Sequence, residues 1–183
     1  MKRSLKLLSV LLLLVNLSFG QELPVDQKTG KITYIEVVDA AGLTASDMYA
    51  VAKKWGNDKK FTLKEDKENE SVLFNGSTPV EYPNASGNNN DKGKVSFTCY
   101  VFLKDGKYRF IFTDLVHTAE GKVVGSDGGK LENVSPDCGK TKMSAKGWVT
   151  IKAKADVNLK ALVADLKRVM KETQNDPAKK SDW

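Results

Sequence analysis

The stretch Lys94–His117, KVSFTCYVFLKDGKYRFIFTDLVH, decides the fold, because it has the pattern of two long strands joined by a tight turn. Asp105-Gly106 lies at its centre and is a strong signal for a two-residue hairpin turn. The flanking segments 94–104 and 107–117 are rich in β-branched and aromatic residues. A two-residue turn fixes the register, so paired residues are expected to have numbers that sum to 211.

This register predicts which side chains share a face of the hairpin. The nearly all-apolar face is the expected core face and comprises Val95, Phe97, Cys99, Val101, Leu103, Tyr108, Phe110, Phe112, Asp114 and Val116. The opposite face is amphipathic and includes Tyr100, Phe102, Arg109, Ile111, Leu115 and His117. Exposed apolar patches mark contact surfaces, so these six residues are the candidate binding site. The alternative is that the N-terminal leader, the loop 119–142 or another subunit covers them.

Capping residues and apolar spacing predict one helix on each side of the hairpin. Thr44, followed by Asp47, fits a capping pattern before apolar residues at helical spacing, and this helix is expected to end near Gly56. Ser144 is the expected cap of a longer helix that runs to about Lys171 with an apolar stripe along one side.

Three further strands are predicted from their β-branched and aromatic content, at 31–39, 60–65 and 71–80. The element order is then β-α-β-β-β-β-α, which predicts an α+β fold. The economical packing is an antiparallel sheet of about five strands with two helices on one face, since both apolar stripes then meet the core face of the hairpin. The opposite face of the sheet is left open.

The N-terminus has the pattern of a secretory signal peptide. A basic start, a nine-residue run from Leu7 to Val15 that is apolar apart from Ser9, and small residues before position 21 predict cleavage after Gly20. The apolar run is too short to span a membrane, which takes about 20 residues. We therefore expect an exported protein, periplasmic or secreted, with no membrane span in the mature chain. The expected organisation is a signal peptide (1–20), an extended leader (21–30), a single domain (31–171) and a flexible C-terminal tail (172–183).

The charge of the chain argues against nucleic acid as a partner. The formal net charge is +6, and removing the expected signal peptide, with three basic residues and no acidic one, lowers it to +3. Basic residues alternate with acidic ones, as in Lys64-Glu65-Asp66-Lys67-Glu68, whereas nucleic-acid binders concentrate positive charge on one face or arm.

The candidate catalytic residues do not form a constellation in the sequence. His117 is the only histidine, and Asp114 lies three residues earlier, so that on a strand the two side chains point to opposite faces. Asp114 is instead expected to be a structural polar residue on the core face, tied to backbone amides, to Trp148 or to a lysine. A hydrolase that uses Asp114 or His117 with a group from the loop 119–142 remains an alternative.

Metal and cofactor sites are not indicated. One histidine and two distant cysteines do not make a zinc site, and no cofactor motif is present. Cys99 and Cys138 can form a disulfide in an exported chain, although their geometry cannot be read from sequence. A third reading, a small-molecule or lipid binder, requires a cavity between the sheet and the helices.

Several short blocks also carry a family resemblance. They are Leu23-Pro24-Val25-Asp26, Thr29-Gly30-Lys31-Ile32, Tyr34, Glu36-Val37-Val38, Met48-Tyr49, Ala52-Lys53-Lys54-Trp55, Asp105-Gly106-Lys107-Tyr108-Arg109, Thr113-Asp114, His117, Cys138-Gly139 and Trp148. With these blocks the chain resembles a bacterial secreted family, domain of unknown function 4468, described as having a TBP-like fold. The resemblance implies that fold and the periplasm or exterior of a Gram-negative cell, and it implies no activity. The TBP-like fold does not by itself imply DNA binding, because proteins with the same fold can have different functions.

The function expected from these observations is a non-enzymatic binding or interaction module of the bacterial cell envelope. Its site is the open sheet face, and its partner is another envelope protein or a second copy of the chain. The hydrolase and the small-molecule or lipid binder remain the alternatives.

Overall fold

The computed structural model describes residues 23–66, 71–121 and 125–176. The expected signal peptide and the end of the expected tail lie outside these residues. The elements are β1 (Tyr34–Asp39), α2 (Ala45–Asp58), β2 (Thr62–Asp66), β3 (Ser71–Pro83), β4 (Asn90–Lys104), β5 (Lys107–Glu120), β6 (Gly129–Lys130) and α3 (Ala145–Gln174).

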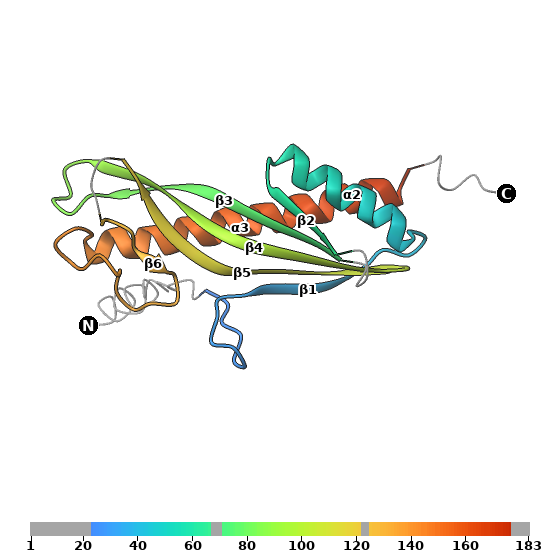
Figure 1. Cartoon of the computed structure of the whole chain (residues 1–183), viewed down its shortest axis with the longest axis horizontal. Coiled ribbons are helices and arrows are strands. Elements are labelled where there is room, and N and C mark those ends of the chain that lie inside the picture. The colour runs from blue at the N-terminus through green and yellow to red at the C-terminus, as the bar shows by residue number, and fades with distance from the viewer. Residues whose placement is uncertain (1–22, 67–70, 122–124, 177–183) are drawn as a thin grey trace, which may run out of the picture.

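The strands form one antiparallel sheet in the order β1-β5-β4-β3-β2, and the two-residue β6 pairs with the far end of β5. The long helix α3 runs along the sheet, and α2 lies beside it over one end (Figure 1). The indole of Trp55 in α2 packs edge-on against Phe74 and Phe112 of the sheet and donates a hydrogen bond to Asp165 of α3. Both helices therefore cover one face of the sheet, and the predicted α+β architecture is confirmed. The short strand β6 was not predicted.

Both helices begin at the predicted caps. The Thr44 hydroxyl accepts a hydrogen bond from the backbone N–H of Asp47, and the Asp47 carboxylate accepts one from the backbone N–H of Thr44, which is a complete capping box. The Ser144 hydroxyl accepts from the backbone N–H of Gly147. Helix α3 continues to Gln174, past the predicted end, so the domain extends into the segment expected to be a tail.

The expected extended leader is instead folded back on itself. Val25 forms a bridge with Ile32, and the N–H of Thr33 donates to the carbonyl of Pro24 over 2.8 Å. Gly30 has φ +69°, a conformation that glycine adopts without steric cost, and it lets the chain reverse. The leader therefore pairs with the segment that leads into β1.

The hairpin register differs from the prediction at one residue. The sum of 211 holds from Lys104↔Lys107 to Thr98↔Thr113, and it becomes 212 at Ser96↔Val116. Asp114, with φ +58°, is the extra residue of a β-bulge. Beyond it each side chain of β5 lies on the opposite face from the one predicted: Leu115 and His117 point into the core, and Asp114 and Val116 do not.

The core lies between the sheet and the two helices. Its centre is a group of aromatic rings in edge or tilted contact, namely Trp55, Phe61, Phe74, Phe97 and Phe112. The predicted core face of the hairpin is confirmed from Val95 to Phe112, where all the expected side chains are buried. The apolar stripe of α3 closes the core with Trp148, Ile151, Leu159 and Leu166.

The bulge makes a test possible at Asp114. Replacing Asp114 by Val places a β-branched side chain at positive φ and is expected to destabilise the fold by about 1–2 kcal/mol. Asp114→Gly relieves the backbone strain, and it is expected to change the free energy of unfolding by less than about 1 kcal/mol, because the ion pair it removes is largely exposed. Urea unfolding of both variants measures the difference. Equal stability of the Val and Gly variants would contradict the bulge.

Candidate functional site

The face of the sheet that carries no helix is lined by apolar and aromatic side chains. Its residues, here called the open face, are Ile35, Val37, Leu73, Tyr100, Phe102, Arg109 and Ile111. The strand pairing aligns them in two rows, Ile35–Ile111–Tyr100–Leu73 and Val37–Arg109–Phe102. Side chains opposite each other on antiparallel strands are neighbours, so each row is continuous across the sheet.

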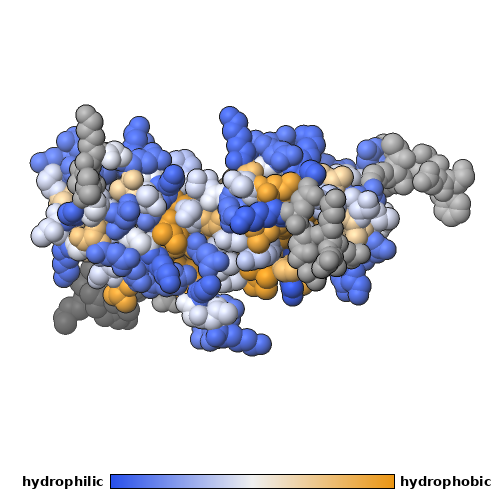
Figure 2. Space-filling view, viewed as in Figure 1, coloured by the Kyte–Doolittle hydropathy of each residue, from blue (hydrophilic) through white to orange (hydrophobic). Residues whose placement is uncertain are grey.

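The open face is exposed most strongly at the β1 side. Ile35 is 56% exposed and Val37 is 60% exposed, whereas Tyr100 and Phe102 are half-buried. The rings of Tyr100 and Phe102 stack with an interplanar angle of 9°, and the Arg109 guanidinium lies 4.5 Å from the centre of the Phe102 ring. Figure 2 shows hydrophobic surface between hydrophilic residues over the middle of the sheet.

The hairpin end of the open face is cationic. A shallow hollow of about 290 Å³ there is lined by Val37, Phe102, Lys104, Lys107 and Arg109, among others. The carboxylate in the adjoining row is Asp39, directly across from Lys107. Among the described residues, the surface thus combines apolar area with an excess of positive charge.

The structure places four of the six predicted site residues on this face: Tyr100, Phe102, Arg109 and Ile111. Leu115 and His117 are fully buried on the other side because of the bulge. Sequence reasoning missed Ile35, Val37 and Leu73. For the first two, the alternation with Tyr34, Glu36 and Val38 is the signal that could have found them, once β1 is known to pair with β5.

The match to a protein family covers the strands that build this face. Residues 34–118 match the family described as a domain of unknown function (DUF4468) with TBP-like fold. Over these residues the chain is similar to the DUF4468 family. They run from β1 through most of β5, and α3 completes the core from outside the matched range.

Two solved structures share the fold of this chain. One is a TBP-like protein from Parabacteroides distasonis ATCC 8503, with 18% identity and a TM-score of 0.58 over 80% of this chain and 97% of that one. The other is a DUF4468 family protein from Bacteroides ovatus ATCC 8483, with 16% identity and a TM-score of 0.54 over 84% and 91% of the two chains. At these identities the likeness shows the fold alone. No curated protein matched.

His117 is a core residue. Its Nδ1 accepts a hydrogen bond of 3.0 Å from the backbone N–H of Gly128, and its ring packs edge-on against Tyr82 and Trp148. Burial lowers the pKa of His117 to about 4, and the nearby Asp127 carboxylate opposes the shift only in part. The imidazole is therefore neutral at pH 7, with its proton on Nε2.

Asp114 does not face His117. Its carboxylate is half-exposed and accepts a hydrogen bond of 2.6 Å from the Lys31 ammonium, which ties β5 to the segment that leads into β1. Of the partners considered from the sequence, namely backbone amides, Trp148 or a lysine, the structure has a lysine, while the expected place on the core face is wrong. The structure therefore brings together no carboxylate–histidine pair from these two residues.

The two cysteines are free thiols. Cys99 is fully buried on the core face of β4, where burial raises the pKa of its thiol, and Cys138 is half-buried in the segment that precedes α3. The disulfide considered from the sequence is therefore not formed.

The described residues, 23–66, 71–121 and 125–176, also bear on a metal site and on a membrane span. No three His, Cys, Asp or Glu side chains in these ranges lie close enough to hold a metal ion. Within the same ranges, no helix is both long and apolar enough to cross a membrane.

The pKa of His117 predicts how stability depends on pH. The unfolded chain, with a histidine pKa of about 6.5, takes up the proton first as pH falls. Above pH 6.5 the buried imidazole therefore does not lower the free energy of unfolding. Between about pH 6.5 and pH 4 that free energy decreases by a total of roughly 3 kcal/mol. Urea unfolding should show the decrease in the native protein and not in His117→Gln. An NMR titration of the single histidine with a midpoint near 6.5 would contradict the burial.

The different burial of the two thiols predicts that an alkylating reagent modifies them in two stages. Native protein treated with iodoacetamide at pH 8 should gain one modification, at Cys138, because the Cys99 thiol is buried and protonated. The second modification should appear only in denaturant. Mass spectrometry counts both, and equal labelling of Cys99 in the native state would show that β4 is not in the core.

Proposed function

We propose that this protein is an exported, non-enzymatic interaction module of the bacterial cell envelope, and that it binds its partner through the open face. The observation that carries the proposal is the pair of continuous side-chain rows across the uncovered face of the sheet, with Ile35 and Val37 more than half exposed. Contiguous exposed apolar surface is rare on monomeric proteins unless it makes contacts.

The composition of the open face supports a protein partner. Aromatic residues and arginine are enriched in protein interfaces, and this face has Tyr100, Phe102 and Arg109 in mutual contact. The rings are already stacked, so binding does not have to order them. Export is supported by the signal-peptide pattern of residues 1–20.

The two alternatives have less support. The hydrolase would need Asp114 or His117 to face a shared pocket, and His117 is inside the core while Asp114 pairs with Lys31 at the surface. The small-molecule or lipid binder would need a hollow inside the core, and the core between the sheet and the helices is filled by aromatic rings and by the stripe of α3. The hollow between β1 and α3 lies at the edge of the sheet and not inside this core.

Paired charge substitutions test the open face. The chain from residue 21 is immobilised and exposed to an envelope extract of its host, and each captured protein is purified and titrated directly. The variant Phe102→Glu/Ile111→Glu should weaken binding at least tenfold, because it places two charges in the contact surface. The matched control Val149→Glu/Val157→Glu changes exposed valines of α3 and should bind like the native chain.

Thermal unfolding confirms that both double variants are folded. If the open-face variant binds its partner as strongly as the native chain, the proposed site is contradicted. If only the α3 variant loses binding, the site lies on the helix instead.

A further inference from the structure

The strand β1 forms an edge of the sheet with one side free. It pairs with β5 and with no other strand that the structure describes. In an antiparallel pair, the backbone N–H and C=O of alternate residues point to the partner and those of the intervening residues point away. The bond from Ala40 N–H to Gly106 C=O shows that even-numbered residues face β5.

The odd-numbered residues therefore present their backbone groups at the free edge. The leader confirms this alternation, since Thr33 N–H donates outward to Pro24 and Lys31 C=O accepts from Asp26 N–H. The leader's pairing ends there. Within the part of the chain that the structure describes, Ile35, Val37 and Asp39 are left with three donors and three acceptors in line with an existing β-bridge.

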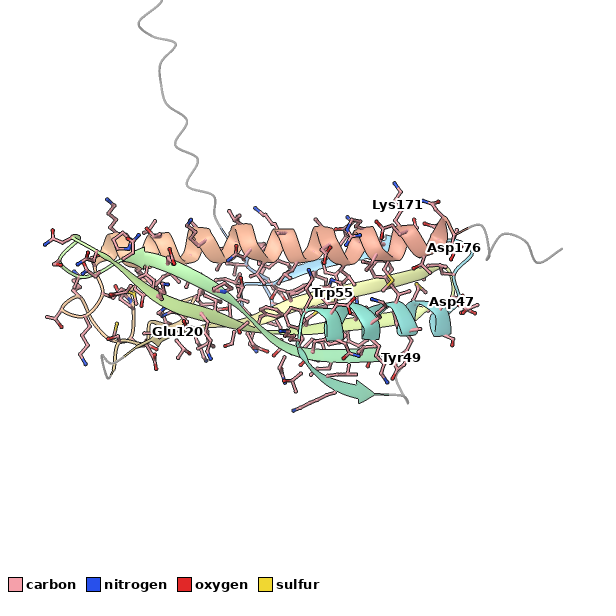
Figure 3. The ribbon with its side chains drawn as sticks, turned by 90° about the horizontal axis from the view of Figure 1, so that it is seen from above. Asp47, Tyr49, Trp55, Glu120, Lys171 and Asp176 are labelled. Atoms are coloured by element: carbon pink, nitrogen blue, oxygen red, sulfur yellow. The ribbon has the colours of Figure 1, made fainter. Side chains whose placement is uncertain are left out.

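This free edge borders a groove. A hollow of about 780 Å³ lies between β1 and α3, and its lining includes Ile35 and Glu36 on the strand and Lys160, Val163 and Lys167 on the helix. The helix α3 runs along the β1 side of the sheet (Figure 3). A strand edge facing a helix across a groove is an arrangement that accepts an extended peptide by strand addition.

We propose that this groove binds an extended peptide of alternating apolar and acidic residues, which pairs with β1 as an additional antiparallel or parallel strand. The inference rests on the proposed function and specifies its partner. The peptide backbone satisfies the outward groups of Ile35, Val37 and Asp39. Its apolar side chains lie beside those of Ile35 and Val37 and extend the open face by one strand.

Carboxylates and lysines both line the groove, so the preference for acidic side chains on the other face of that strand rests on the cation at its Lys171 end. Lys160 pairs with the buried Asp156, and Lys167 pairs with Glu36, so these two lysines are compensated. Lys171, one turn farther along α3, lines the adjoining hollow and has no carboxylate partner among the described residues. Figure 3 shows Lys171 projecting from the side of α3 away from α2. An acidic side chain on the peptide compensates this cation.

A second copy of the chain fits the edge less well than a peptide. Pairing two β1 strands around a two-fold axis sets the two α3 helices side by side, because each lies along its own β1 edge. Lys160 and Lys167 are already paired within their own copy, so this arrangement offers Lys171 no free carboxylate, whereas an acidic peptide does.

A synthetic peptide tests the proposal. The probe is acetyl-Glu-Val-Glu-Val-Glu-Val-amide, titrated into ¹⁵N-labelled chain from residue 21 and followed by NMR. The expected result is saturable shifts and slower hydrogen exchange at the amides of Ile35, Val37 and Asp39. Two further peptides carry N-methyl groups on alternate amides, one along each edge of the strand. The peptide that is methylated on the edge facing β1 should bind at least tenfold more weakly. A peptide with Lys in place of Glu should not bind.

Two variants at one position separate backbone pairing from side-chain contact. Val37→Pro removes one outward N–H and should weaken binding at least tenfold, whereas Val37→Ala keeps that N–H and should stay within threefold. If Val37→Pro does not fold, the N-methylated peptides make the same comparison with the native chain.

Each other outcome overturns the edge site. Shifts confined to Tyr100 and Phe102 would place the peptide on the open face and leave the proposed function intact. Slow exchange at the three β1 amides without peptide would mean that the edge is already occupied, by a second copy if the mass doubles and by the chain's own N-terminal residues if it does not. No binding at 1 mM peptide also overturns the edge site, while the Phe102→Glu/Ile111→Glu experiment still decides the proposed function.

Discussion

The pairing of β4 with β5 determines where almost every other side chain of this domain lies. The turn at Asp105-Gly106 sets the register, and the bulge at Asp114 shifts it once. Because side chains alternate between faces, that single extra residue decides that His117 is in the core and that Asp114 reaches Lys31 at the surface. The strand β1 then pairs with the unbulged part of β5, which places Ile35 and Val37 on the open face.

Much of the fold could be predicted because its signals are local. The caps at Thr44 and Ser144 and the tight hairpin turn are read from neighbouring residues. The bulge was missed because alternation was extended through it without a break. The sequence does hold a sign of it, since a charged Asp114 in the apolar row and an apolar Leu115 in the next position mark a change of phase. The two-residue β6 has no such sign, because its pairing depends on a long loop.

The candidate site was predicted as far as the hairpin alone allowed. The part of the hairpin between its turn and the bulge has the predicted register. Four site residues belong to this part and lie on the predicted face: Tyr100, Phe102, Arg109 and Ile111. Ile35 and Val37 belong to a strand whose neighbour in the sheet lies about 75 residues away in sequence, and no local pattern reports such a pairing. The resulting surface joins a stacked aromatic pair, an exposed aliphatic edge and unpaired backbone groups, so the likeness to TBP-like structures describes its scaffold and not its use.

The central claim is that the bulged register leaves one face of the sheet open and buries His117 on the other. Hydroxyl-radical footprinting of the chain from residue 21, read by mass spectrometry, tests it at single side chains. The account predicts strong modification of Tyr100, Phe102 and Ile35, with Phe112, Leu115 and His117 protected until the protein unfolds. Protection of Tyr100 and Phe102 together with modification of Leu115 and His117 would contradict it.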